Sequence, residues 1–148
     1  MADSQLEKDV GPDGEVVWRS HRGTVRIRRP ARDVVVFVEE RYLDAGFAAI
    51  IDDACNEAVR EAKRIHIFVD AFNLDGYVPE VRTGATEWLK RNKDHVIRQH
   101  MLVRSKITKM GLSVASLALG GVLMGHASRA TFDNELRKCL RPGHAVRV

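Results

Sequence analysis

The hydrophobic pattern divides the chain into short apolar runs and longer segments that carry a single apolar stripe. Residues 33–38 and 65–69 are runs rich in Val, Ile and Phe, which are typical of short strands buried on both faces. Residues 15–20 are a further short strand candidate, and residues 24–29 alternate apolar and polar side chains, as half-buried strands do. The chain is therefore predicted to open with two or three antiparallel strands joined by tight turns.

Helical periodicity appears between the later apolar runs. A long helix is predicted over residues 45–64, with Asp44 as its N-cap and one buried stripe. The stripe consists of Phe47, Ile50, Ile51, Ala54, Ala58 and Ala62. A second helix is predicted to begin at Pro79, because a first helical turn tolerates proline. Its buried stripe is predicted to be Val81, Ala85, Trp88 and Leu89.

Two further strand-helix pairs complete the pattern. Strands are predicted over residues 98–103 and 122–125, and a helix over residues 106–119 with Ser105 as its cap. Gly120 and Gly121 are predicted to end that helix. Ser128 is predicted to cap a last helix, whose inward residues are Phe132, Leu136, Cys139 and Leu140.

Strands that alternate with helices predict an α/β fold with a mixed, largely parallel sheet and opening antiparallel strands. At 148 residues the chain is most simply one domain. Its predicted boundaries are residues 15–141, after a polar lead over residues 1–14 that is expected to be disordered. Residues 142–148 are predicted to be a tail.

The composition indicates the expected cellular location and excludes some classes of protein. The start has no apolar core typical of a secretory signal, so a cytoplasmic location is expected. Cys55 and Cys139 fall on apolar helical stripes and are predicted to be reduced, buried thiols. The sequence contains no cluster of Cys and His that would suggest a metal site. It also lacks a phosphate-binding glycine loop that would suggest a nucleotide enzyme, so no cofactor is expected.

One uncharged run calls for a membrane check. Residues 110–125 carry no charge, but a spanning helix needs about 20 apolar residues, and Gly120 and Gly121 interrupt the run. The run is predicted to be water-soluble core, and no membrane contact is expected.

The parallel strands predict where function lies, because partners and ligands meet the loops at the carboxyl ends of such strands. Two loops, residues 70–77 and 104–106, are expected at the same edge. The candidate binding residues are Asp70, Asn73, Asp75, Tyr77, Arg104, Ser105 and Lys106. Cations at a helix N-terminus oppose the helix dipole, so the site suits an anion. The alternative is a salt bridge to Asp75 or Glu80.

The motif IFVDAFNLDG also looks like the opening strand of PIN and NYN ribonuclease domains. Metal-dependent cleavage needs several carboxylates that converge on the ion. The later strands end in Arg104-Ser105-Lys106 and His126-Ala127-Ser128, which supply none. The chain is therefore expected not to be an enzyme, with a metal-dependent nuclease as the alternative.

An arginine-rich surface is predicted on the opening strands. Its members are Arg19, Arg22, Arg26, Arg28, Arg29 and Arg32. On a half-buried strand such residues usually form a solvated face. Nucleic-acid binding is the alternative; it is not expected, and it would show a steep salt dependence.

The element order resembles the STAS domain family, and within it the SpoIIAA-like group. The resemblance covers residues 24–140 and rests on the strand IHIFVD, its following loop and helix, the strand QHMLV, and the closing VLMGHASRATFDNEL. It implies a mixed sheet with helices, no catalytic activity and binding of partner proteins, with nucleotides bound by some members. A regulatory module with a protein partner, or with an anionic or nucleotide ligand, is therefore expected. A homodimer stays open.

The chain departs from that family at one position. Anti-sigma antagonists carry an Asp-Ser-Ser-Gly-like phosphoacceptor between the central strand and its helix. This chain has Asn73-Leu74-Asp75-Gly76-Tyr77 there, with Tyr77 as its one hydroxyl residue. Asp75 supplies a permanent negative charge, so constitutive binding is expected in place of a phosphorylation switch.

Overall fold

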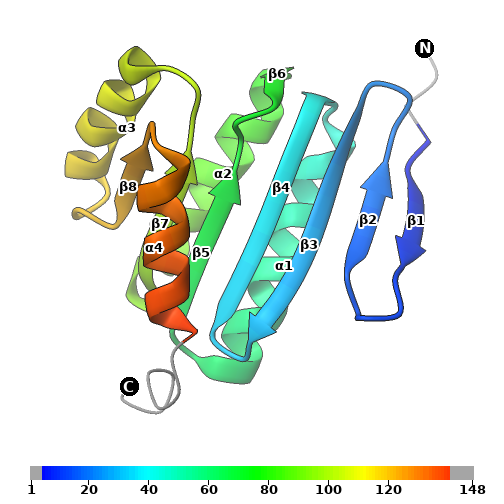
Figure 1. The fold of residues 1–148 in the computed structure, drawn as a ribbon, viewed down its shortest axis with the longest axis horizontal. Coiled ribbons are helices and arrows are strands. Elements are labelled where there is room, and N and C mark those ends of the chain that lie inside the picture. Colours follow the sequence, from blue (N-terminus) through cyan, green and yellow to red (C-terminus); the bar gives the residue numbers. More distant parts are fainter. Residues whose placement is uncertain (1–4, 141–148) are drawn as a thin grey trace.

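The computed structural model describes residues 5–140, which form an eight-stranded mixed sheet with four α-helices (Figure 1). The strands are β1 (Glu7–Val10), β2 (Val16–Arg19), β3 (Gly23–Ala31), β4 (Val34–Leu43), β5 (Ile65–Asp70), β6 (Leu74–Tyr77), β7 (Val96–Leu102) and β8 (Leu123–His126). The helices are α1 (Gly46–Ala62), α2 (Pro79–Asn92), α3 (Lys106–Ala118) and α4 (Arg129–Cys139), with a 3-10 turn, η1 (Lys93–His95), after α2. The predicted tail, residues 142–148, lies outside the described residues.

The sheet has an antiparallel half and a parallel half. Strands β1 to β4 pair antiparallel in chain order, and β4, β5, β7 and β8 then pair parallel. Strand β6 pairs parallel with the last residues of β4, beyond the end of β5. The predicted α/β class, with opening antiparallel strands and a mixed sheet, is confirmed.

Helices cover the two faces of the sheet unequally. On one face α1, α2 and α3 enclose a large core that includes Phe37, Phe47 and Trp88. On the other face α4, alone among the described helices, covers a small core of Val34, Val36, Phe68, Leu102, Phe132 and Cys139 (Figure 1). The predicted central strands are confirmed, since only Val38 and His66 are partly exposed within residues 33–38 and 65–69.

The predicted disordered lead is wrong for the part that the structure describes. Residues 7–10 form β1, although all four of its side chains are exposed. Backbone pairing with β2 holds this strand, together with the ion pair of Asp9 and Arg19 and the Lys8 ammonium 5.4 Å from the Trp18 ring. A strand held this way leaves no hydrophobic pattern in the sequence.

Several helical details differ from the prediction. Ala45, not Asp44, is the N-cap of α1, because the Asp44 carboxylate instead accepts from Arg22. Ala85 is exposed on α2, whereas Gly84 faces Ala48 of α1 and permits close packing of the two helices. Leu140 is also exposed. The predicted ends hold, with Pro79 in the first turn of α2 and positive φ at Gly120 and Gly121 after α3.

The uncharged run is only partly core. Leu119 and Leu123 are buried, but Met110, Val114 and Leu117 of α3 are exposed. The prediction of a buried helix is therefore wrong for its outer face, because α3 lies at the end of the sheet against β8, and none of the described helices and strands covers its outward side (Figure 1). None of the described helices is long and apolar enough to span a membrane. Cys55 and Cys139 are buried free thiols, as predicted.

Candidate functional site

The carboxyl ends of β4, β5, β7 and β8 meet at one edge of the sheet, which we call the carboxyl edge (Figure 1). The loop after β5, strand β6, and the loops after β7 and β8 all lie there. This placement brings together two predicted segments that are about 30 residues apart in sequence. Figure 1 shows the same edge at the top of the sheet.

Arg104 links the two predicted loops. Its Nη2 atom donates to the Leu74 carbonyl at 3.0 Å and lies 3.3 Å from Oδ1 of Asp75. Both side chains are exposed, so the pair contributes at most about 1 kcal/mol to stability. The predicted juxtaposition of opposite charges is confirmed, and so is the simpler expectation of a salt bridge between Arg104 and Asp75. The ion pair therefore positions the guanidinium more than it stabilises the fold.

Asp70 anchors a second arginine that the sequence analysis missed. Its Oδ1 atom accepts from the backbone N–H of Phe72 at 3.1 Å, and its Oδ2 atom accepts from Arg129 at 3.0 Å. The Asp70 side chain is largely buried, whereas Arg129 is half exposed. Arg129 is the first residue of α4 and follows β8 after a loop of two residues. The order of parallel strands could have indicated it, because the loop after β8 must reach the same edge.

Phe72 lies close to both arginines. The guanidinium carbons of Arg104 and Arg129 lie 6.0 and 5.8 Å from the centroid of its ring. Each guanidinium is also fixed by one aspartate, Asp75 or Asp70. The carboxyl edge thus presents two prepositioned cations that lie near one aromatic ring, an arrangement that we call the arginine pair.

Two helix N-termini add to the positive character of this edge. Ser105 Oγ accepts from the Thr108 N–H at 3.3 Å, which confirms the predicted cap of α3. Ser128 is the N-cap of α4 by position, but its side chain makes no cap hydrogen bond. Neither helix has an acidic residue in its first turn, where a negative side chain would neutralise the positive end of the helix dipole.

The remaining predicted residues have separate roles in the geometry. Asn73 accepts a hydrogen bond through its backbone oxygen from the Arg41 N–H at 3.0 Å. Tyr77 is exposed and lies at the far end of β6, paired with Leu43. Lys106 is exposed at the start of α3. The structure therefore brings Asp70, Asp75 and Arg104 together and places Tyr77 at the other end of β6.

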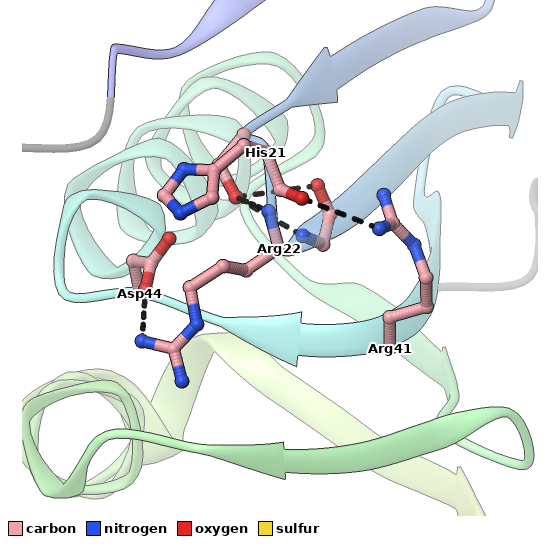
Figure 2. A network of polar contacts seen from close by, with 6 residues as sticks. His21, Arg22, Arg41 and Asp44 are labelled. Carbon is pink, nitrogen blue, oxygen red and sulfur yellow. Dashed lines mark hydrogen bonds and ion pairs between the residues drawn. The ribbon is translucent and has the colours of Figure 1, made fainter.

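A second polar network extends the carboxyl edge to the turn between β2 and β3 (Figure 2). Arg22 lies 3.2 Å from Asp44, and its guanidinium carbon lies 3.9 Å from the Tyr42 ring centroid. Arg41 reaches the His21 carbonyl at 3.5 Å from a backbone with φ of 65°. Both arginines thus have partners within this network, and we interpret the network as a structural support for the turn.

The other arginines of the opening strands also have local partners. Arg26 lies 3.6 Å from Glu15 and 3.5 Å from Glu40, and Arg29 lies 2.8 Å from Glu61. The remaining contacts are Arg19 with Asp9, Arg28 with Glu15, and Arg32 with the Glu61 carbonyl. Interspersed carboxylates reduce the positive potential that a nucleic acid would need. The contacts agree with the expected solvated face.

Glu39 is a buried carboxyl behind the carboxyl edge. Burial raises its pKa from 4.5 to about 7, and the charge of Asp70 adds to this rise. The alternation of β4 places Glu39 on the face of Phe37 under α1, while that of β5 places Asp70 on the face of Phe68 under α4. The two carboxylates therefore point to opposite faces and do not converge on one ion.

His100 and His126 form a buried hydrogen-bonded chain under α4. Thr131 Oγ1 donates to the Ser128 carbonyl at 3.0 Å, so it accepts from His126 Nδ1 at 2.9 Å. His126 Nε2 then accepts from His100 Nδ1 at 2.9 Å. With this assignment His126 has no lone pair directed at the Thr131 hydroxyl, so the group is a structural chain and not a nucleophile with its base.

The geometry bears on the nuclease alternative. Within residues 5–140, no group of three or more His, Cys, Asp or Glu side chains is arranged to hold a metal ion. Asp70 is the strand-end carboxylate that a nuclease would use to bind a metal ion. Here its carboxylate accepts hydrogen bonds from the Phe72 N–H and from Arg129. The loops after β7 and β8 bring cations to the edge, where metal-dependent cleavage needs further carboxylates.

Comparison with solved structures identifies the fold. The chain is similar to an uncharacterised protein of the DUF3478 family from Shewanella loihica, described as having a SpoIIAA-like fold. The two share 13% sequence identity with a TM-score of 0.60, over 92% of this chain and 98% of that chain. Neither protein-family models nor curated proteins give a match. The predicted SpoIIAA-like fold is therefore confirmed from structure alone.

Proposed function

We propose that this SpoIIAA-like chain is a non-catalytic interaction module that binds an anionic group at its carboxyl edge. The observation that carries the proposal is the arginine pair, in which Arg104 and Arg129 both lie near Phe72 and each is anchored by an aspartate. The group recognised is a carboxylate or a phosphate. It is either part of a partner protein or a free small anion such as a nucleotide.

Preorganisation supports a binding role for these residues. An arginine already fixed by a carboxylate loses less side-chain freedom when it meets a second anion. Arg104 and Arg129 remain exposed in their ion pairs, so each has further donors available to a partner. Asp75 is also exposed, and a surface with both signs of charge favours discrimination between partners and rapid association.

The chemistry at the edge favours binding over catalysis. Covalent catalysis requires a nucleophile beside a base, and metal-assisted hydrolysis requires converging ligands. The described carboxyl edge instead combines arginines, a lysine, helix N-termini and a phenylalanine ring. These are typical groups for recognition of an anionic surface.

The test begins with the partner. In-cell cross-linking with mass spectrometry identifies it, and its affinity is then measured at one salt concentration for three proteins. The first is the unchanged chain, and the second carries Arg104→Glu with Lys106→Glu at the carboxyl edge. The third carries Arg64→Glu with Lys93→Glu, which makes the same charge change at the opposite edge, where both residues are exposed.

We expect the carboxyl-edge variant to bind at least tenfold more weakly, about 1.4 kcal/mol, and the control to bind nearly as well as the unchanged chain. A parallel titration with inorganic phosphate separates the two sources of the anion. Phosphate binding that the carboxyl-edge variant loses indicates a free anion, whereas partner binding without phosphate binding indicates a protein surface. Equal affinity of both variants, each shown to be folded by circular dichroism, contradicts the proposal.

A further inference from the structure

Helix α3 carries an exposed apolar stripe on its outer face. Met110, Val114 and Leu117 are 67%, 70% and 82% exposed, respectively. Their spacing of four and three residues places them on one side of the helix. The opposite side, with Leu112, Ala115 and Ser116, packs against the core, so the helix cannot turn to hide the stripe.

Exposed side chains of this size rarely lie together on a soluble monomer without a function. By contrast, the other strongly exposed aliphatic residue among the described residues, Val10, stands alone on β1 at the far edge of the sheet. The stripe on α3 is therefore a candidate interface, and its flanking charges indicate what it contacts.

The charge around the stripe has one sign. No Asp or Glu occurs between Asp94 and Asp133, a segment that includes all of α3. Lys106 and Lys109 lie in the first turn of the helix, and Lys106 shares the outer face with Met110. The outer face of α3 is thus basic in its first turn and apolar along the rest.

We propose that α3 docks an acidic amphipathic helix of a partner protein, with Met110, Val114 and Leu117 as its apolar contacts. The partner helix presents apolar side chains at helical spacing toward this stripe and carboxylates toward Lys106 and Lys109. Because α3 begins two residues after Arg104, this contact continues the surface of the proposed function onto α3, and it rests on that function being protein binding.

The same observations disfavour two other occupants. In a second copy of this chain, α3 would bring the same cations and no acidic residue to meet them. An anionic membrane favours cations along a helix and aromatic residues at its surface. Here the lysines stand only in the first turn, and α3 has no aromatic residue.

A displayed library of random peptides of about 16 residues, long enough for roughly four helical turns, tests the inference without a known partner. The library is selected on the unchanged chain. Each enriched peptide is then titrated against three proteins: the unchanged chain, Met110→Ser with Leu117→Ser, and Val10→Ser. Val10→Ser is the matched control, because it removes an equally exposed apolar side chain elsewhere. Vesicle co-sedimentation and sedimentation equilibrium are measured for the same proteins.

We expect enriched peptides with apolar residues at helical spacing and an excess of Asp and Glu. Their affinity should fall tenfold or more for the α3 variant, stay unchanged for Val10→Ser, and weaken with salt. Peptides without acidic residues, no enrichment, or equal affinity for both variants would overturn the inference. So would binding to anionic vesicles, or a dimer, that the α3 variant alone loses.

The outcome also separates this inference from the proposed function. Arg104→Glu alone changes the carboxyl edge and spares Lys106. Peptides that lose affinity with Arg104→Glu alone but not with the α3 variant support the carboxyl edge and overturn docking on α3. Peptides with the reverse behaviour support docking on α3 and contradict the placement of the anion site.

Discussion

The Nδ1 atom of His100 lies 2.9 Å from the Nε2 atom of His126, beneath α4 and against the ring of Phe68. Only one proton fits between these nitrogens, so the ring that accepts this hydrogen bond is neutral. Burial, with a smaller contribution from His126, lowers the pKa of His100 from 6.5 to about 4. Burial also lowers the pKa of His126, while the charge of Glu135 on α4 acts in the opposite direction.

The first prediction concerns the stability of the folded chain at acid pH. Because the pKa of His100 is lower in the folded than in the unfolded chain, the unfolded chain takes up the proton first as the pH falls below 6.5. The contribution of His100 to stability, about 3 kcal/mol, is therefore lost between pH 6.5 and 4. Proton uptake on unfolding, measured by calorimetry in this range, should include this proton, offset by the proton that Glu39 releases. It should be smaller in His100→Leu, and equal uptake in both proteins would contradict the assignment.

The second prediction concerns Glu39, whose raised pKa has the opposite effect. The folded chain keeps this proton up to about pH 7, so stability is lost as the pH rises from 4.5 to 7. Glu39→Gln should therefore raise the free energy of unfolding at pH 8 by up to about 3 kcal/mol, with little change at pH 4.5. Urea unfolding at both values measures this. Glu40→Gln is the control and should change stability by less than about 1 kcal/mol.

These two effects oppose each other between pH 4.5 and 6.5. The unchanged chain should have a nearly flat stability profile there, whereas Glu39→Gln should lose stability as the pH falls. A flat profile in that variant would show that burial does not lower the pKa of His100.

The third prediction concerns a close backbone approach. A Cβ atom on Gly23 would lie 1.8 Å from the Tyr42 carbonyl oxygen, which cannot move without breaking the turn between β2 and β3. Gly23→Ala should destabilise the chain by about 1–3 kcal/mol. Gly111→Ala, where no atom lies within 4 Å, should instead stabilise α3 by about 0.5–1 kcal/mol. Thermal unfolding of both variants checks the contrast in sign.

The fourth prediction concerns the small core under α4. Phe68 is fully buried, stacks on His100 at 4.6 Å and meets Phe132 edge-on at 5.6 Å. Phe68→Ala should cost about 3–5 kcal/mol in urea unfolding. Met110→Ala, at an exposed position, should stay within about 0.5 kcal/mol. An unchanged midpoint for Phe68→Ala would mean that α4 does not seal this face.

The sequence predicted the elements that burial defines and missed those that backbone pairing defines. The runs over β4 and β5 are buried on both faces, so their composition alone indicated strands. Strands β1 and β6 have four residues each and no buried side chain. They are held by pairing with β2 and β4, which leaves no periodic pattern to detect.

The candidate site was predictable to the extent that strand order fixes it. Parallel pairing placed Asp75 and Arg104 at one edge, as expected from their positions after β5 and β7. Arg129 was missed because its segment was interpreted only as a helix start. The exposed stripe on α3 was taken for core, because a sequence pattern shows that a face is apolar but not which element covers it.

The most direct test of the central claim is an NMR titration of the isotope-labelled chain with inorganic phosphate, which needs no identified partner. The account predicts saturable shifts in the backbone amides of residues 70–77, 104–108 and 128–132, and in the side-chain N–H groups of Arg104 and Arg129. These shifts should disappear in Arg104→Glu with Lys106→Glu. Saturable shifts confined to the arginines of β2 and β3, or saturable shifts that persist in that variant, would contradict an anion-binding carboxyl edge.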